Sequence, residues 1–288
     1  MEWVQNHPAI ATAIIAVAGA IAGGLIAAGA KFVFDFYLSE RIKRRWRTVD
    51  IKRQYSAQII RAADELASRL DNLSRHLADG MATKWLRPLD EESETPNIAF
   101  HRYYFSSSLY LLAQLIAWIE VLKREQIFLD FATVRETRRF NSHLELLYSV
   151  LSYSALTGAD SERQPKNYWI YYHYLGGVGQ SLFIGKGDNN LRCLTFHEFC
   201  SKFDSKDGDF RNWMREVEAL IVNLSVDGDD VRWRRLQMLR LCLDQFLNFA
   251  DPKMLRTTRN RMQPKDIPED ICQQVAKQAR YFGLKIKA

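Results

Sequence analysis

The stretch "AIATAIIAVAGAIAGGLIAAGAKFVF", residues 9–34, contains no charged side chain from Ala9 to Ala30. As a helix, the uncharged part from Ala9 to Ala30 rises about 33 Å, which is close to the hydrocarbon thickness of a bilayer. The preceding residues, "MEWVQNHP", include an acid and no lysine or arginine, whereas a cleaved secretory signal begins with basic residues. A cleaved signal and a buried core helix are the alternatives. The pattern favours a retained transmembrane helix over residues 9–37.

Basic residues follow the apolar stretch in the segment "ERIKRRWR". Lysine and arginine beside a span favour the cytoplasmic side. We therefore expect residues 1–8 outside the cell and the bulk of the chain in the cytoplasm, anchored in the inner (plasma) membrane as a single-pass protein. Lipid headgroups are the nearest anions for these side chains and for the basic C-terminal segment. The predicted lipid-binding residues are Arg41, Lys43, Arg44, Arg45, Arg47, Lys253, Arg256, Arg259 and Arg261.

The predicted span is rich in alanine and glycine, although leucine would favour insertion more strongly. Its small residues form two neighbouring rows with a spacing of four, which lets a second backbone approach closely. This predicted oligomerisation face consists of Ala16, Gly19, Ala20, Gly23, Gly24, Ala27 and Ala28. A coiled-coil-like seam from Ile59 to Leu77 is expected to continue the contact into the cytoplasm. The alternative is an alanine-rich anchor without a partner.

The basic excess is concentrated at the two flanks of the body. The net formal charge is +5 over residues 31–53, −4 over residues 54–251 and +6 over residues 252–288, which with Glu2 gives the total of +6. The four cysteines show no ladder of short spacings, which indicates reduced thiols in a cytosolic body. The predicted organisation is a short extracytoplasmic end (1–8), a transmembrane helix (9–37), a cytoplasmic helical domain (38–251) and a basic tail with an amphipathic helix (252–288).

Apolar residues at helical spacing recur along the whole body, which predicts an all-α fold: a span continuing into a long stalk helix, then an irregular helical bundle. Thr195 and Glu198 form a capping box, and Asp209 is the expected cap of the next helix. Capping and helix-breaking residues mark the ends of the predicted helices, which cover about residues 31–79, 96–130, 133–156, 167–185, 195–205, 209–224, 230–251 and 268–282.

Two segments allow other interpretations. The aromatic run "NYWIYYHYLGGVGQSLFIGKGDNN" is compatible with a strand, but one-face spacing favours a helix broken near Gly185. Residues 103–119 are uncharged and are long enough to suggest a second span. A second span would place Arg135, Arg138 and Arg139 outside the cell, against the charge bias, so a buried core helix is the better interpretation.

The motifs that resemble catalytic or binding signatures are incomplete. "GGVGQSLFIGKG" has the wrong glycine spacing for a phosphate-binding loop, and its lysine is followed by glycine. Cys193, His197 and Cys200 have helical metal-ligand spacing, but the capping residue Thr195 separates Cys193 from the helix. No cofactor is therefore expected.

Helical RNases of the HEPN type use an arginine followed by four to six residues and a histidine. Three pairs have this spacing, where chance alone supplies roughly one or two, and Arg138 with His143 fits best. The other two pairs are Arg69 with His76 and Arg192 with His197. Enzymatic activity is thus not the favoured interpretation, and nucleic acid is not the expected partner.

The sequence therefore predicts a membrane-anchored helical interaction or scaffold protein that binds lipids, assembles as a homo-oligomer and contacts a cytoplasmic protein. This plan is similar to that of bacterial single-pass proteins with an N-terminal anchor and a helical cytoplasmic body, and no specific motif carries the likeness. Two alternatives stay open. One is a pore-forming effector of a bacterial defence or toxin system, and the other is a membrane-tethered HEPN-like RNase.

Overall fold

The computed structural model divides the chain into two units, residues 1–53 and residues 54–288. It describes residues 9, 12–13, 16–17, 19–21, 23–24, 31–32, 39–78, 86, 98–125, 134–153, 168–185, 192–205, 208–225, 230–255, 257 and 267–285. In the first unit, all of the described residues between 9 and 32 are helical and exposed.

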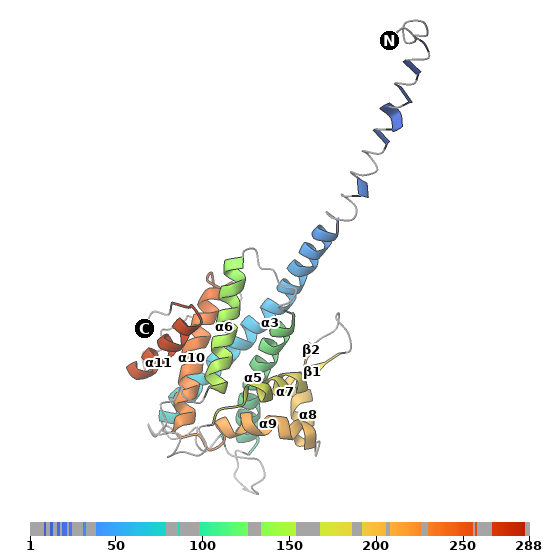
Figure 1. Ribbon diagram of the computed structural model, residues 1–288. Coiled ribbons are helices and arrows are strands. Elements are labelled where there is room, and N and C mark those ends of the chain that lie inside the picture. Colours follow the sequence, from blue (N-terminus) through green and yellow to red (C-terminus); the bar gives the residue numbers. More distant parts are fainter. Residues whose placement is uncertain are drawn as a thin grey trace. The chain divides into compact units, whose positions relative to one another are not determined.

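The described part of the chain is almost entirely helical, which confirms the all-α prediction (Figure 1). The only strands among the described residues are β1 (Phe183–Ile184) and β2 (Arg192–Cys193), which pair antiparallel with Phe183 opposite Cys193. The elements are α3 (Ser39–Ala78), α5 (Ile98–Glu125), α6 (Val134–Ser152), α7 (Tyr172–Ser181), β1 (Phe183–Ile184), β2 (Arg192–Cys193), α8 (Phe196–Asp204), α9 (Gly208–Ile221), α10 (Val231–Ala250) and α11 (Glu269–Tyr281).

The helices of the second unit form two groups (Figure 1). In one group α5 packs against α7, α8 and α9, and in the other α10 packs against α6 and α11. Contacts of α6 with α5 and with α7 join the groups. The predicted tail helix, α11, buries Ile271, Val275 and Ala279, so it is packed into the helical unit and is not a separate appendage.

The apolar seam of α3 lies in the core of this same unit. Ile59, Ala63 and Leu66 are buried, as are Leu70 and Leu73. Further contacts join α3 to the body: the ring of Tyr55 lies 6.1 Å from that of Trp118, and Arg69 lies over the ring of Tyr104. The expectation that this seam pairs with another copy is therefore corrected. Seam spacing shows that a face is covered, and here the chain's own helices cover it.

Helix α5 is the central helix of its group. Among the described residues, the segment Arg102–Arg124 is the one helix long and apolar enough to cross a membrane by length and composition, and most of it is buried inside the unit. Its polar side chains are accommodated locally, since the hydroxyls of Ser107 and Ser108 donate to the carbonyl of Tyr104. This burial agrees with the prediction of a core helix.

Local sequence signals locate most helix ends correctly. Thr195 and Glu198 form the predicted capping box, and Asp230 caps α10 by accepting from the amide of Arg232. Helix α10 ends at Ala250, and Asp251, the predicted end, is its C-cap. Asp209 is not a cap, because α9 already begins at Gly208 and places this acid in its first turn.

The aromatic segment forms both a helix and a strand. Helix α7 ends at Ser181, and β1 follows before the predicted break at Gly185. Gly185 has a φ angle of 136°, a backbone conformation that residues with a Cβ atom rarely adopt. The strand interpretation of the aromatic run is thus correct for Phe183 and Ile184 only, and the helix covers Tyr172 to Ser181.

Two buried arginines of α10 connect this helix to its neighbours. Arg235 is 0% exposed and donates to the carbonyls of Val150 and Tyr153, at the C-terminal end of α6. A cation is favourable there, because the last carbonyls of a helix lack helical partners. Arg240 pairs with Asp71 of α3 and with Asp244 of its own helix.

Candidate functional site

A cavity of about 290 Å³ lies in the second unit between α3, α5 and the start of α8. Helices α3 and α5 contribute aromatic rings and amides, and the segment of β2 that leads into α8 contributes the opposite wall. This volume is at the lower end of the range for small-molecule sites. The lining residues are Tyr55, Gln58, Tyr110, Gln114, Trp118, Arg192, Cys193, Leu194 and Thr195.

A short hydrogen-bond chain fixes the orientation of two lining side chains. The Tyr110 hydroxyl donates to the backbone carbonyl of Leu194 at 2.8 Å, because a carbonyl can only accept. The Tyr110 oxygen is then the acceptor for the Gln114 amide nitrogen at 3.0 Å. This assignment leaves the Gln114 Oε1 atom as an amide acceptor that is buried and has no protein partner.

The cation of the cavity wall is already neutralised. Arg192 donates through two nitrogens to the two carboxylate oxygens of Glu198, each at 2.7 Å. These bonds, with those from the backbone and hydroxyl of Thr195, lower the pKa of Glu198 to about 2. The capping box that begins α8 therefore also holds Arg192 in a neutral pair.

The other ionisable groups of the wall are uncharged at neutral pH. Burial raises the pKa of the Cys193 thiol to about 12. Burial also raises the pKa of Tyr110 above its usual value of 10. The cavity thus offers aromatic faces, amides, a phenol and a thiol, with no net charge.

A second polar cluster joins α5, α6 and α7. The ammonium group of Lys123 lies 2.8 Å from the carboxylate of Glu145. It also lies 4.0 Å from the ring centroid of Tyr148 and 4.4 Å from that of Tyr172. Cation–π attraction and the ion pair both stabilise this position. Because Lys123 is engaged from three sides, we assign the cluster to helix packing.

The candidate metal ligands do not come together. Cys193 lies on β2, ahead of the capping box, and is partly buried, whereas His197 is exposed on α8. Cys200 is partly buried one turn further along α8, and burial raises the pKa of its thiol. Within the described parts of the chain, no group of at least three histidine, cysteine, aspartate or glutamate side chains has the arrangement of a metal site.

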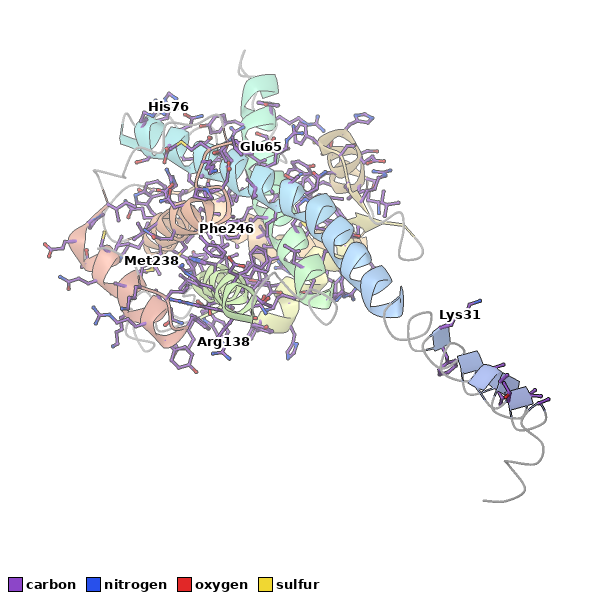
Figure 2. The ribbon with its side chains drawn as sticks, turned by 90° about the horizontal axis from the view of Figure 1, so that it is seen from above. Lys31, Glu65, His76, Arg138, Met238 and Phe246 are labelled. Carbon is purple, nitrogen blue, oxygen red and sulfur yellow. The ribbon has the colours of Figure 1, made fainter. Side chains whose placement is uncertain are left out.

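The side chains of the RNase-type pair, Arg138 and His143, are in different surroundings. Arg138 is exposed on α6 (Figure 2), whereas His143 on the same helix is buried and stacks on Phe249 with ring centroids 4.8 Å apart. Burial, with a smaller effect of Arg139, lowers the pKa of His143 to about 4. A neutral histidine packed against Phe249 is a core residue.

The other two arginine–histidine pairs also serve different purposes. Arg69 lies over the ring of Tyr104, and His76 is in the last turn of α3 (Figure 2). Arg192 is held by Glu198, and His197 is exposed.

The structure describes some residues of the predicted oligomerisation face and some of the predicted lipid-binding residues. Of the oligomerisation face, Ala16, Gly19, Ala20, Gly23 and Gly24 are helical and exposed, and Ala27 and Ala28 lie outside the described residues. Of the lipid-binding set, the backbone of Arg41, Lys43, Arg44, Arg45 and Arg47 is helical, Lys253 is exposed, and Arg256, Arg259 and Arg261 lie outside the described residues. Both assignments stay predictions.

Of the residues that line the cavity, the sequence points to Arg192, Cys193 and Thr195, and to each of them for another role. Gln114 stands out only as an amide within an uncharged helix, and Tyr55 and Trp118 occupy ordinary core spacing. The segments that form the cavity are separated by more than forty residues along the chain. Comparison of the chain with models of protein families, with curated proteins and with solved structures finds no match.

Proposed function

We propose that this chain is a membrane-anchored helical interaction protein, with residues 9–37 as the span and the helical body in the cytoplasm. The observation that carries the proposal is the exposure of large apolar side chains on the N-terminal helical segment. Val17 is 59% exposed, Ile21 is 61% exposed and Phe32 is 67% exposed. Apolar side chains gathered on a helix need covering, and the acyl chains of a bilayer provide it.

Self-association through the span is the second part of the proposal. A Cβ atom added at Gly19, Gly23 or Gly24 would meet no heavy atom of this chain within 4 Å. A neighbouring helix has room to approach this face closely, and close backbone packing drives helix association in lipid. Because the α3 seam is occupied within its own unit, the proposal places the contact between copies in the span alone.

The anchor is tested by fractionating cells that express the full chain. We expect the protein in the membrane pellet after alkaline extraction, because a spanning helix is not held by surface charge. Release into the supernatant would contradict the anchor.

Self-association is tested by cross-linking in the same membranes. Gly23→Leu with Gly24→Leu should abolish the dimeric and higher species. The matched control is Ala18→Leu with Ala22→Leu, which adds nearly as much bulk on the opposite side of the helix at 100° per residue and should leave the species intact. A wild type that gives only monomer, or equal ladders in the two double variants, would contradict self-association.

A further inference from the structure

The cavity between α3, α5 and the start of α8 has an incomplete set of hydrogen bonds. A buried polar atom normally has a partner, and leaving one without a partner costs roughly 1–3 kcal/mol. The Gln114 Oε1 atom is such an acceptor on the wall of the cavity. A ligand or an ordered water that donates a hydrogen bond would satisfy it.

Rotation of the Gln114 amide does not remove the requirement. Turning the amide by 180° would place its oxygen against the Tyr110 oxygen, whose proton is already donated to Leu194. Two acceptors would then face each other. The fold therefore fixes the carbonyl edge of Gln114 as the free edge, which selects for a donor on the ligand.

The remaining walls define the shape and charge of that ligand. Tyr55, Tyr110 and Trp118 contribute aromatic rings to the wall, and flat rings pack favourably against aromatic side chains. The Arg192–Glu198 pair leaves no net charge in the wall, which disfavours an anion or a cation. The volume of about 290 Å³ suits a ligand of one or two fused rings.

We propose that this cavity binds a small, flat, uncharged nitrogen heterocycle of the purine or pyrimidine class, whose N–H donates to Gln114 Oε1. Gln114 accepts a hydrogen bond from the ligand, Tyr110 fixes the orientation of Gln114, and the aromatic side chains pack against the ligand ring. The ligand is a free base or nucleoside, because a polyanionic strand finds no uncompensated cation in the wall. Binding at this site does not depend on the membrane anchor or on self-association.

The test uses calorimetric titration of the full-length protein in detergent with two probes that differ at one position. Theophylline carries one ring N–H, and caffeine carries a methyl group in its place. We expect saturable one-to-one binding of theophylline, with caffeine weaker by roughly 2- to 10-fold for the loss of one neutral hydrogen bond. Adenine and adenosine should also bind, and the titration with a short oligoadenylate should show no binding.

Three variants test whether Gln114 is the source of the preference for theophylline over caffeine. Gln114→Leu should reduce the theophylline-to-caffeine ratio to about one. Tyr110→Phe should also lower the ratio, because the amide of Gln114 is then free to rotate. The matched control is Gln180→Leu, an exposed glutamine on α7, which should keep the wild-type ratio. If Gln114→Leu does not fold, as judged by circular dichroism, Tyr110→Phe carries the test.

Several results would overturn the proposal. Wild-type protein that is folded but binds none of the free bases would show that the acceptor is satisfied by ordered water alone. Equal affinities for theophylline and caffeine, or a wild-type ratio in Gln114→Leu, would remove Gln114 as the selecting group. Binding of oligoadenylate alone would indicate a surface site for nucleic acid in place of this cavity.

Discussion

Replacing Arg235 tests whether a buried cation holds α6 and α10 together. The side chain is fully buried and is the donor to the carbonyls of Val150 and Tyr153, which end α6. Each hydrogen bond from a charged donor contributes about 1.5–3 kcal/mol. Removal of the guanidinium also relieves the cost of burying it, which is seen in the lowering of its pKa to about 10. We therefore expect Arg235→Met to destabilise the fold by about 2–4 kcal/mol, since methionine keeps much of the stem but cannot donate.

The adjacent arginine provides a matched control. Arg234 pairs with Asp270 on a more exposed surface, where an ion pair contributes at most about 1 kcal/mol. Urea unfolding followed by tryptophan fluorescence should show a midpoint lowered by about 1–2 M for Arg235→Met, at a slope of about 2 kcal/mol per M. Arg234→Met should stay close to the wild type. Equal midpoints for the two variants would refute the role given to Arg235.

Two further predictions concern packing and pH. Gly179→Ala should destabilise the fold by about 1–3 kcal/mol in thermal unfolding, because the added Cβ would lie 2.9 Å from the Glu120 Cβ. In the control variant Gly176→Ala, the added Cβ would lie 3.7 Å from the Glu120 side chain. This is an ordinary contact distance, so the variant should keep the wild-type stability. An equal loss in both variants would contradict the close approach of α5 and α7. The pKa of His143 is lowered to about 4 by burial, so the unfolded chain takes up a proton that the folded chain excludes. Stability should therefore fall as the pH drops from about 6.5 toward 4, by up to about 3 kcal/mol. His143→Phe should flatten this part of the stability profile, and an unchanged profile would show that the histidine is not responsible.

Local features of the sequence were sufficient for most helix ends. The capping box of Thr195 and Glu198 and the cap at Asp230 depend on residues within four positions of one another, so the pattern contains the whole interaction. The predicted start of α9 differs slightly from the observed one, because an acid such as Asp209 stabilises a helix both as its cap and in its first turn. The two-residue strand at Phe183 was not separable from the end of α7, because its pairing partner is a separate segment.

The long-range features could not be obtained in this way. The α3 seam predicts that a face is buried, but the spacing is the same whether the covering helices belong to this chain or to a second copy. Arg235 and Arg240 interrupt an apolar pattern in α10, and charged side chains at such positions are usually exposed. Their partners, at the end of α6 and on α3, are brought close only by the fold.

The cavity was missed for the same reason. Its acceptor, Gln114, is set apart from other amides only by Tyr110 and Leu194, which fix its orientation and are brought close by the fold. Conversely, the metal and RNase patterns met the spacing rules without converging in space. Spacing along one helix does not bring Arg138 and His143 to a common face, because five residues correspond to about 140° of rotation.

Labelling of single introduced cysteines in intact cells tests the proposed anchor and orientation most directly. Gln5→Cys lies in the segment before the apolar stretch, and Lys285→Cys lies at an exposed position that follows α11. With a membrane-impermeant maleimide, we predict that Gln5→Cys reacts in intact cells and that Lys285→Cys reacts only after the cells are permeabilised. Reaction of Lys285→Cys in intact cells, or protection of Gln5→Cys until permeabilisation, would contradict a single span with a cytoplasmic body.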